Sequence, residues 1–149
     1  MLRFNLIQRI QRFAFWAWKQ EGTPAERARG IALGVFSGCF PFFGFQTLIG
    51  IALARLCRGN LLLAAFATWI SNPVTYLPIF WLNYRVGEYF LGVGRRLDHI
   101  NKLSSEDLLS QGWFFSSRIL LGSSVVGLIL GIVLGAISYQ FFKSMSYKK

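Results

Sequence analysis

The chain has 149 residues, 54% of them hydrophobic and 17% aromatic, and it carries a formal net charge of +10 with only six acidic side chains. A soluble domain of this length cannot bury so much apolar surface, so the composition indicates an all-α integral membrane protein. The basic residues are scattered between apolar runs without a basic stripe or an RNA-binding motif, which speaks against nucleic-acid binding. Basic side chains at cytoplasmic helix ends, facing anionic lipid headgroups, account for the charge.

The first predicted element is an amphipathic helix over residues 2–20. At 100° per residue, polar and basic side chains gather on one side and aromatic and aliphatic side chains on the other. This pattern is typical of a helix that lies in the membrane surface, but a cytosolic helix packing on a partner protein has it too. We divide the chain into this interfacial segment (1–22), a single membrane domain (23–142) and a basic tail (143–149).

A capping box opens the next predicted helix. Thr23 can cap it, Pro24 suits the first helical position, and Glu26 lies three residues after the cap. The helix is therefore expected to start at Pro24 and to run toward Phe40, where Pro41 interrupts it.

Two proline-containing breaks, CFPFFGFQT and WISNPVTYLP, divide the apolar region into short helices. The pieces expected around the breaks are residues 24–40, 45–56, 61–70 and 78–92. Each is shorter than the roughly 20 residues that cross the hydrocarbon core alone. They must therefore pair either as two re-entrant hairpins or as two kinked spanning helices. The positive-inside tendency favours hairpins, which would keep the flanking arginines on one side.

The last apolar run, Ile119–Phe142, is long enough to span a membrane and is undivided. Before it, Ser104 offers a cap for a separate, short surface helix. Three glycines spaced four apart give the spanning helix one face that another helix can approach closely: Gly127, Gly131 and Gly135. This glycine zipper is equally suited to packing inside the molecule and to forming a dimer.

The side chains that flank the breaks are the candidate ligand-binding residues. A proline frees backbone carbonyls, and half-helix ends present partial charges that are costly in lipid but useful around a ligand. Amides and hydroxyls there can bind a headgroup, a sugar hydroxyl or a cation, or they can cap each other's helix ends without a ligand. We expect the breaks to approach each other, where Gln46 and Asn72 can bridge them or coordinate a ligand between them. The candidates are Pro41, Gly44, Gln46, Thr47, Asn72, Pro73 and Thr75.

No constellation in the sequence indicates catalysis. Arg85 and Glu88 lie three apart on one helix face, and a buried ion pair explains both charges. No nucleophile with a base and no phosphate loop accompanies them. Cys39 and Cys57 are isolated and His99 is the single histidine, so neither a metal site nor a cofactor is expected.

Two motifs give the chain a family resemblance. The first, P-x-x-G-x-Q-T, and the second, N-P-x-T-x-x-P, are formed by Pro41, Gly44, Gln46 and Thr47, and by Asn72, Pro73, Thr75 and Pro78. Together with the glycines at 30, 34 and 38 and the Arg-Gly-Asn linker at 58–60, they make residues 20–140 resemble the DUF2062 family of small bacterial membrane proteins. Relatives are sometimes fused to, or neighbours of, glycosyltransferase-type proteins, so the resemblance implies envelope lipid or polysaccharide chemistry.

Two function hypotheses follow. In the first, the protein transports or handles a lipid or polyprenyl headgroup in the bacterial inner membrane, through a polar site that the two breaks form, with anionic lipids as partners. In the second, it is a non-catalytic scaffold that binds other membrane proteins, or a second copy of itself, through its glycine face and amphipathic N-terminus.

Overall fold

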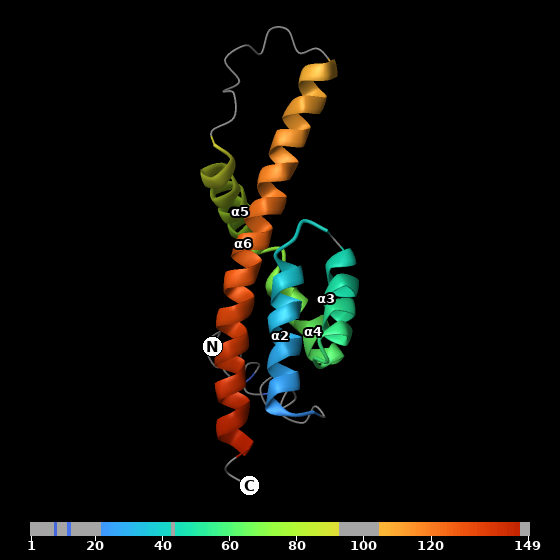
Figure 1. Cartoon of the computed structure of the whole chain (residues 1–149), viewed down its shortest axis with the longest axis vertical. Coiled ribbons are helices and arrows are strands. Elements are labelled where there is room, and N and C mark those ends of the chain that lie inside the picture. Colours follow the sequence, from blue (N-terminus) through green and yellow to red (C-terminus); the bar gives the residue numbers. More distant parts are fainter. Residues whose placement is uncertain (1–7, 9–11, 13–21, 43, 93–104, 147–149) are drawn as a thin grey trace.

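A computed structural model describes residues 8, 12, 22–42, 44–92 and 105–146 (Figure 1). Every regular element within these residues is helical, so the predicted fold class is confirmed in this respect. The elements are α2 (Pro24–Gly38), α3 (Phe45–Leu56), α4 (Leu61–Ala67), the 3-10 helix η1 (Thr68–Ile70), α5 (Tyr76–Leu91) and α6 (Ser105–Ser146). Of the amphipathic helix predicted over residues 2–20, only residues 8 and 12 fall within the described part.

The start of α2 is built by the predicted capping box. The Thr23 side chain accepts a hydrogen bond from the Glu26 N–H at 3.2 Å, and the Glu26 carboxylate accepts one from the Thr23 N–H at 2.8 Å. The helix ends at Gly38, slightly before the expected Phe40. Pro41 explains the early end, because a proline ring disfavours helical geometry in the residue before it.

The two breaks turn the chain in different ways. α2 and α3 run antiparallel, and the first break connects them at one end of the bundle (Figure 1). α4 runs parallel to α2. After η1 and the second break, α5 continues in the same general direction, beyond the end of α2 (Figure 1). The first break therefore reverses the chain, whereas the second one only offsets it.

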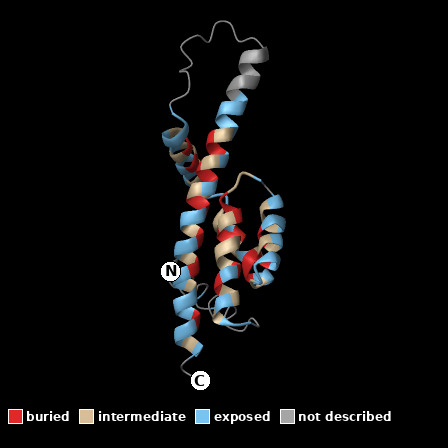
Figure 2. Ribbon diagram, in the orientation of Figure 1, coloured by how far each residue is buried: buried red, intermediate tan, exposed pale blue. Residues whose placement is uncertain are grey.

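α2 is the innermost helix of the bundle. A Cβ added at its glycines would overlap backbone carbonyls of the segment 60–68 that runs beside it; the facing pairs are Gly30 with Asn60, Gly34 with Ala64 and Gly38 with Thr68. Large apolar side chains are exposed on α3, α4, α5 and α6 but not on α2. Figure 2 shows the same contrast between the buried faces that meet inside and the exposed outer faces.

The glycine face of α6 packs against the opposite side of α2. A Cβ at Gly131 would lie 2.8 Å from the Ala32 carbonyl oxygen, and one at Gly127 would lie 3.0 Å from that of Phe36. Gly135 faces Ala32 in the same way. All three glycines therefore face α2 within the molecule.

The length of α6 differs from the sequence prediction. Instead of a short surface helix and a separate apolar helix, one continuous helix of 42 residues runs from Ser105 to Ser146. No proline lies between the two predicted pieces, so the backbone hydrogen bonds can continue. Among the described residues, its segment Gly112–Ser146 is the one long and apolar enough to cross a membrane, with an 18-residue stretch of mean hydropathy 2.4.

Candidate functional site

Uncharged polar side chains from five segments gather where the two breaks meet. We call this group the break cluster; it consists of Thr47, Thr68, Ser71, Asn83 and Ser123, together with the carbonyls of Gly38 and Cys39. Thr68, Asn83 and Ser123 are completely buried. Such groups are costly in an apolar interior unless they are hydrogen-bonded, so their partners decide what the cluster does.

The carbonyls freed at the end of α2 are satisfied by the other half of the molecule. The Ser71 hydroxyl, in the second break, donates to the Gly38 carbonyl. The Asn83 amide of α5 donates to the Cys39 carbonyl at 2.9 Å and to the Ser123 hydroxyl of α6, also at 2.9 Å. One amide thus connects α2, α5 and α6 at the point where α2 stops.

A pair of threonines makes a second connection between the breaks. The hydroxyls of Thr47 in α3 and Thr68 in η1 lie 3.0 Å apart. Thr68 also donates to the Ala65 carbonyl one turn earlier, at 2.6 Å. The first break is therefore hydrogen-bonded to the segment that leads into the second.

Asn72 and Thr75 close the turn that precedes α5. The Asn72 side-chain oxygen accepts from the N–H groups of Val74 and Thr75, at 2.9 and 3.0 Å. The Thr75 hydroxyl accepts from the Asn72 N–H at 3.0 Å and donates to the Ile70 carbonyl. Both side chains are thus engaged within the second break itself.

The breaks are in contact, as predicted, but not through Gln46 and Asn72. The Gln46 side chain is half-buried and makes no hydrogen bond to another described residue; its backbone N–H donates to the Phe42 carbonyl at 2.9 Å. Gly44 has a φ of +80°, which explains why a glycine stands there. Pro41 and Pro73 flank the contact without donating to it. Ligand binding by these residues remains a prediction.

Sequence reasoning missed Asn83 and Ser123. Each is a polar side chain in an otherwise apolar helix, and that was the available signal. The Asn83 side-chain oxygen is buried and has no hydrogen-bond partner among the described residues.

Arg118 lies further along the contact between α5 and α6. It is 7% exposed, and it donates to the Tyr84 hydroxyl at 3.3 Å and to the Gly92 carbonyl at 2.9 Å. A Cβ at Gly87 would overlap the Arg118 backbone, so the two helices are very close here. A guanidinium at the end of α5 also offsets the negative end of that helix. Arg118 therefore fixes α5 on α6.

Arg85 and Glu88 form an ion pair, with 3.1 Å between Arg85 Nη1 and Glu88 Oε2. The Arg85 side chain is 61% exposed and that of Glu88 19%, so the pair is half-exposed rather than buried. Within the part of the chain that the structure describes, no cluster of histidine, cysteine, aspartate or glutamate could hold a metal ion.

The opposite end of the bundle is basic. Arg29, Arg55, Arg58 and Lys143 are exposed there. The Asn60 N–H donates to the Glu26 carbonyl at 2.8 Å, which brings the linker after α3 back to the start of α2. The Arg27 guanidinium lies 5.4 Å from the centre of the Phe142 ring and joins α2 to the end of α6.

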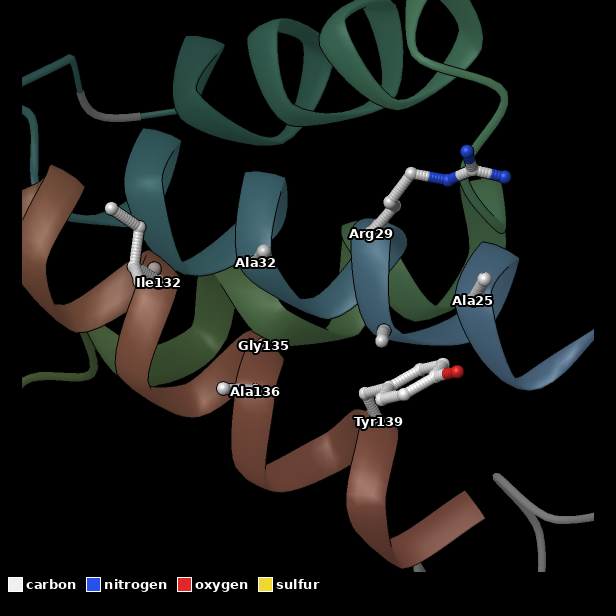
Figure 3. A pocket seen from close by; sticks show the side chains of 9 residues that line it. Ala25, Arg29, Ala32, Ile132, Gly135, Ala136 and Tyr139 are labelled. Carbon is white, nitrogen blue, oxygen red and sulfur yellow. The ribbon is translucent and has the colours of Figure 1, made fainter. Parts of the chain in front are cut away.

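A shallow groove of about 340 Å³ lies between α2 and α6 near this basic end (Figure 3). Its floor is made mainly of small residues, and its longest side chains are Arg29 and Tyr139. The lining residues are Ala25, Ala28, Arg29, Ala32, Gly131, Ile132, Gly135, Ala136 and Tyr139.

Comparison with known proteins gives one match. The model of a family described as "Uncharacterized protein conserved in bacteria (DUF2062)" matches residues 7–149. No curated protein and no solved structure matches the chain. The match covers nearly the whole chain and extends beyond residues 20–140, which carry the resemblance in the sequence.

Proposed function

The chain belongs to the DUF2062 family of bacterial proteins, and we propose that it is an integral protein of the bacterial inner membrane that binds anionic lipid headgroups at its basic end. The role is one of binding and handling lipid, without catalysis. The observation that carries it is the collection of exposed cations, without an exposed acidic partner among the described residues, at one end of a largely apolar bundle.

Two charge-free segments support a spanning placement. Residues 59–84 cover α4, η1 and most of α5, and residues 119–142 cover most of α6. The second segment is about 36 Å long at helical rise, against about 30 Å for a hydrocarbon core. The charged residues that bound the two segments are Arg58 and Arg85, and Arg118 and Lys143.

The α2–α3 pair supports a re-entrant hairpin. Residues 30–54 carry no charge, and the pair begins and ends at the basic end, beside Arg29 and Arg55. In this topology the α2–α3 pair enters the membrane and returns to the same side, whereas α4, η1 and α5 together cross it. The exposed apolar side chains of these segments then face lipid; among them, large exposed fractions are those of Val74, Leu77 and Trp69.

The charge of the basic end favours anionic headgroups. Its four exposed cations are Arg29, Arg55, Arg58 and Lys143. Glu26, the acidic residue at the start of α2, is used in the capping box. Basic side chains next to a membrane surface attract anionic lipids, at about 1 kcal/mol each. By the positive-inside tendency this end faces the cytoplasm.

The break cluster is a weaker candidate for a substrate site. Its hydroxyls and amides are hydrogen-bonded to each other and to the end of α2, so a ligand would have to displace these bonds. A scaffold role through the glycine face meets a similar obstacle, since α2 already covers Gly127, Gly131 and Gly135. Neither obstacle applies to the exposed cations of the basic end.

Cysteine labelling tests the topology. In a background with Cys39→Ala and Cys57→Ala, we expect Arg29→Cys and Arg58→Cys to label with an impermeant maleimide from the cytoplasmic side. Tyr89→Cys, at the exposed end of α5, should label from the opposite side. Labelling of all three from one side would refute the crossing of α4–α5.

Lipid preference tests the binding role. The purified protein should retain phosphatidylglycerol over phosphatidylcholine, and the triple variant Arg29→Gln, Arg55→Gln, Arg58→Gln should lose this preference. Arg85→Gln, at the other end, is the matched control and should keep it. An unchanged preference in the triple variant would contradict the proposal.

A further inference from the structure

We infer that the groove between α2 and α6 holds one chain of an anionic phospholipid, with its phosphate at the mouth of the groove. This inference rests on the proposed function and gives it a specific site. The groove lies on the outer surface of the bundle, and its lining includes the exposed residues Ala25, Ile132 and Ala136. In a bilayer, a surface hollow of this kind is filled by lipid or by another helix.

The floor of the groove suits a hydrocarbon chain. It is formed by Ala28 and Ala32 of α2 and by Gly131 and Gly135 of α6, whose backbones approach closely. The groove runs along α6 from Gly131 to Tyr139, about 12 Å at helical rise. This length is close to one leaflet of an about 30 Å hydrocarbon core. A chain entering from the basic end would therefore fit along it.

The mouth of the groove suits a phosphate. Figure 3 shows the Tyr139 ring along the groove with its hydroxyl toward the Ala25 end, while the Arg29 side chain leaves α2 toward the start of α4. The Lys143 ammonium lies 5.9 Å from the centre of the Tyr139 ring. The Tyr139 hydroxyl can donate to a lipid phosphate, and the exposed Lys143 ammonium beside its ring can pair with that phosphate. This charge distinguishes the lipid from a second copy, which would bring its own basic end to the same place.

Filling the groove provides the test. Ala136→Phe places a ring in the groove from an exposed position, and Ala52→Phe makes the same change on the exposed face of α3 as a matched control. We expect Ala136→Phe to lower the phosphatidylglycerol retained by the purified full-length protein, measured by native mass spectrometry, by about tenfold. Ala52→Phe should retain as much as the unmodified protein.

A second pair of variants tests the mouth. The double variant Tyr139→Phe, Lys143→Gln should reduce the preference for phosphatidylglycerol over phosphatidylcholine while the groove still binds a chain.

Equal lipid retention by Ala136→Phe and Ala52→Phe would overturn the inference. A change in oligomer mass in Ala136→Phe would overturn it too, because it would assign the groove to a second copy. If the unmodified protein shows no headgroup preference at all, the proposed function itself fails; if it shows one that Ala136→Phe keeps, only the groove is wrong.

Discussion

The two proline breaks have similar sequences but opposite consequences for the path of the chain. At the first, α2 ends and α3 returns beside it; at the second, α4 and η1 end and α5 continues onward. Neither α3 nor α5 has a side-chain cap, but the first break has a glycine at φ +80°, whereas the second is a turn closed by hydrogen bonds between Asn72, Val74 and Thr75. A positive φ lets the chain reverse, and a short hydrogen-bonded turn leads into the next helix without a reversal.

The close contact of α2 with α4 should have the largest effect on stability, because it holds α4 beside α2 after the chain has reversed twice. Gly34→Leu would drive a side chain into the Ala64 backbone, and we expect loss of the folded state. Gly112→Leu is the matched control, since nothing lies within 4 Å of a Cβ there. Thermal unfolding in detergent and size-exclusion profiles compare the two. Equal profiles would show that the contact between α2 and α4 does not stabilise the fold.

The Asn83 amide should have the next largest effect, since it joins the end of the first helix to α5 and α6. Asn83→Leu leaves the Cys39 carbonyl without that donor, and we expect a loss of about 1–2 kcal/mol in unfolding free energy. Gln46→Leu, in the first break, should change it by less than about 0.5 kcal/mol. Titration with a denaturing detergent measures both. A larger loss in Gln46→Leu would mean that the sequence-based assignment of the bridge was right.

The turn before α5 should have the smallest effect. Asn72→Ala removes the acceptor for the N–H groups of Val74 and Thr75, and we expect a loss of about 1 kcal/mol in unfolding free energy. Asn72→Asp keeps the acceptor and should retain most of the stability. The same denaturation experiment checks the pair. Matching losses in the two variants would indicate that the amide acts through a contact other than these two hydrogen bonds.

Local features of the fold could be predicted from the sequence, and non-local ones could not. The capping box and the start of α3 at Phe45 depend on neighbouring residues, and both were predicted correctly. The direction of the chain after each break depends on which helix packs beside α2, and this depends on contacts such as Gly34 with Ala64. The continuous α6 was not predicted, because the polar residues before Ile119 indicated a boundary between two helices. No proline in α6 breaks the helix there.

The candidate site divides in the same way. Thr47 was predicted as a ligand-binding candidate from its position beside a break, and its hydroxyl lies 3.0 Å from that of Thr68; ligand binding there stays a prediction. Asn83 was not predicted, because its partners Cys39 and Ser123 are 44 and 40 residues away along the chain. A polar residue inside an apolar helix indicates that a partner exists but does not indicate where.

The two covered faces of α2 become available at different times during synthesis. Gly30, Gly34 and Gly38 find their partners within residues 60–68, so α2, α3 and α4 can assemble as soon as the first half of the chain has left the ribosome. The face of Ala28, Ala32 and Phe36 waits for Gly127–Gly135, near the end of the chain. Until α6 has been synthesised, that face of α2 lacks its partner. The synthesis of α6 is therefore the step that covers the second face of α2.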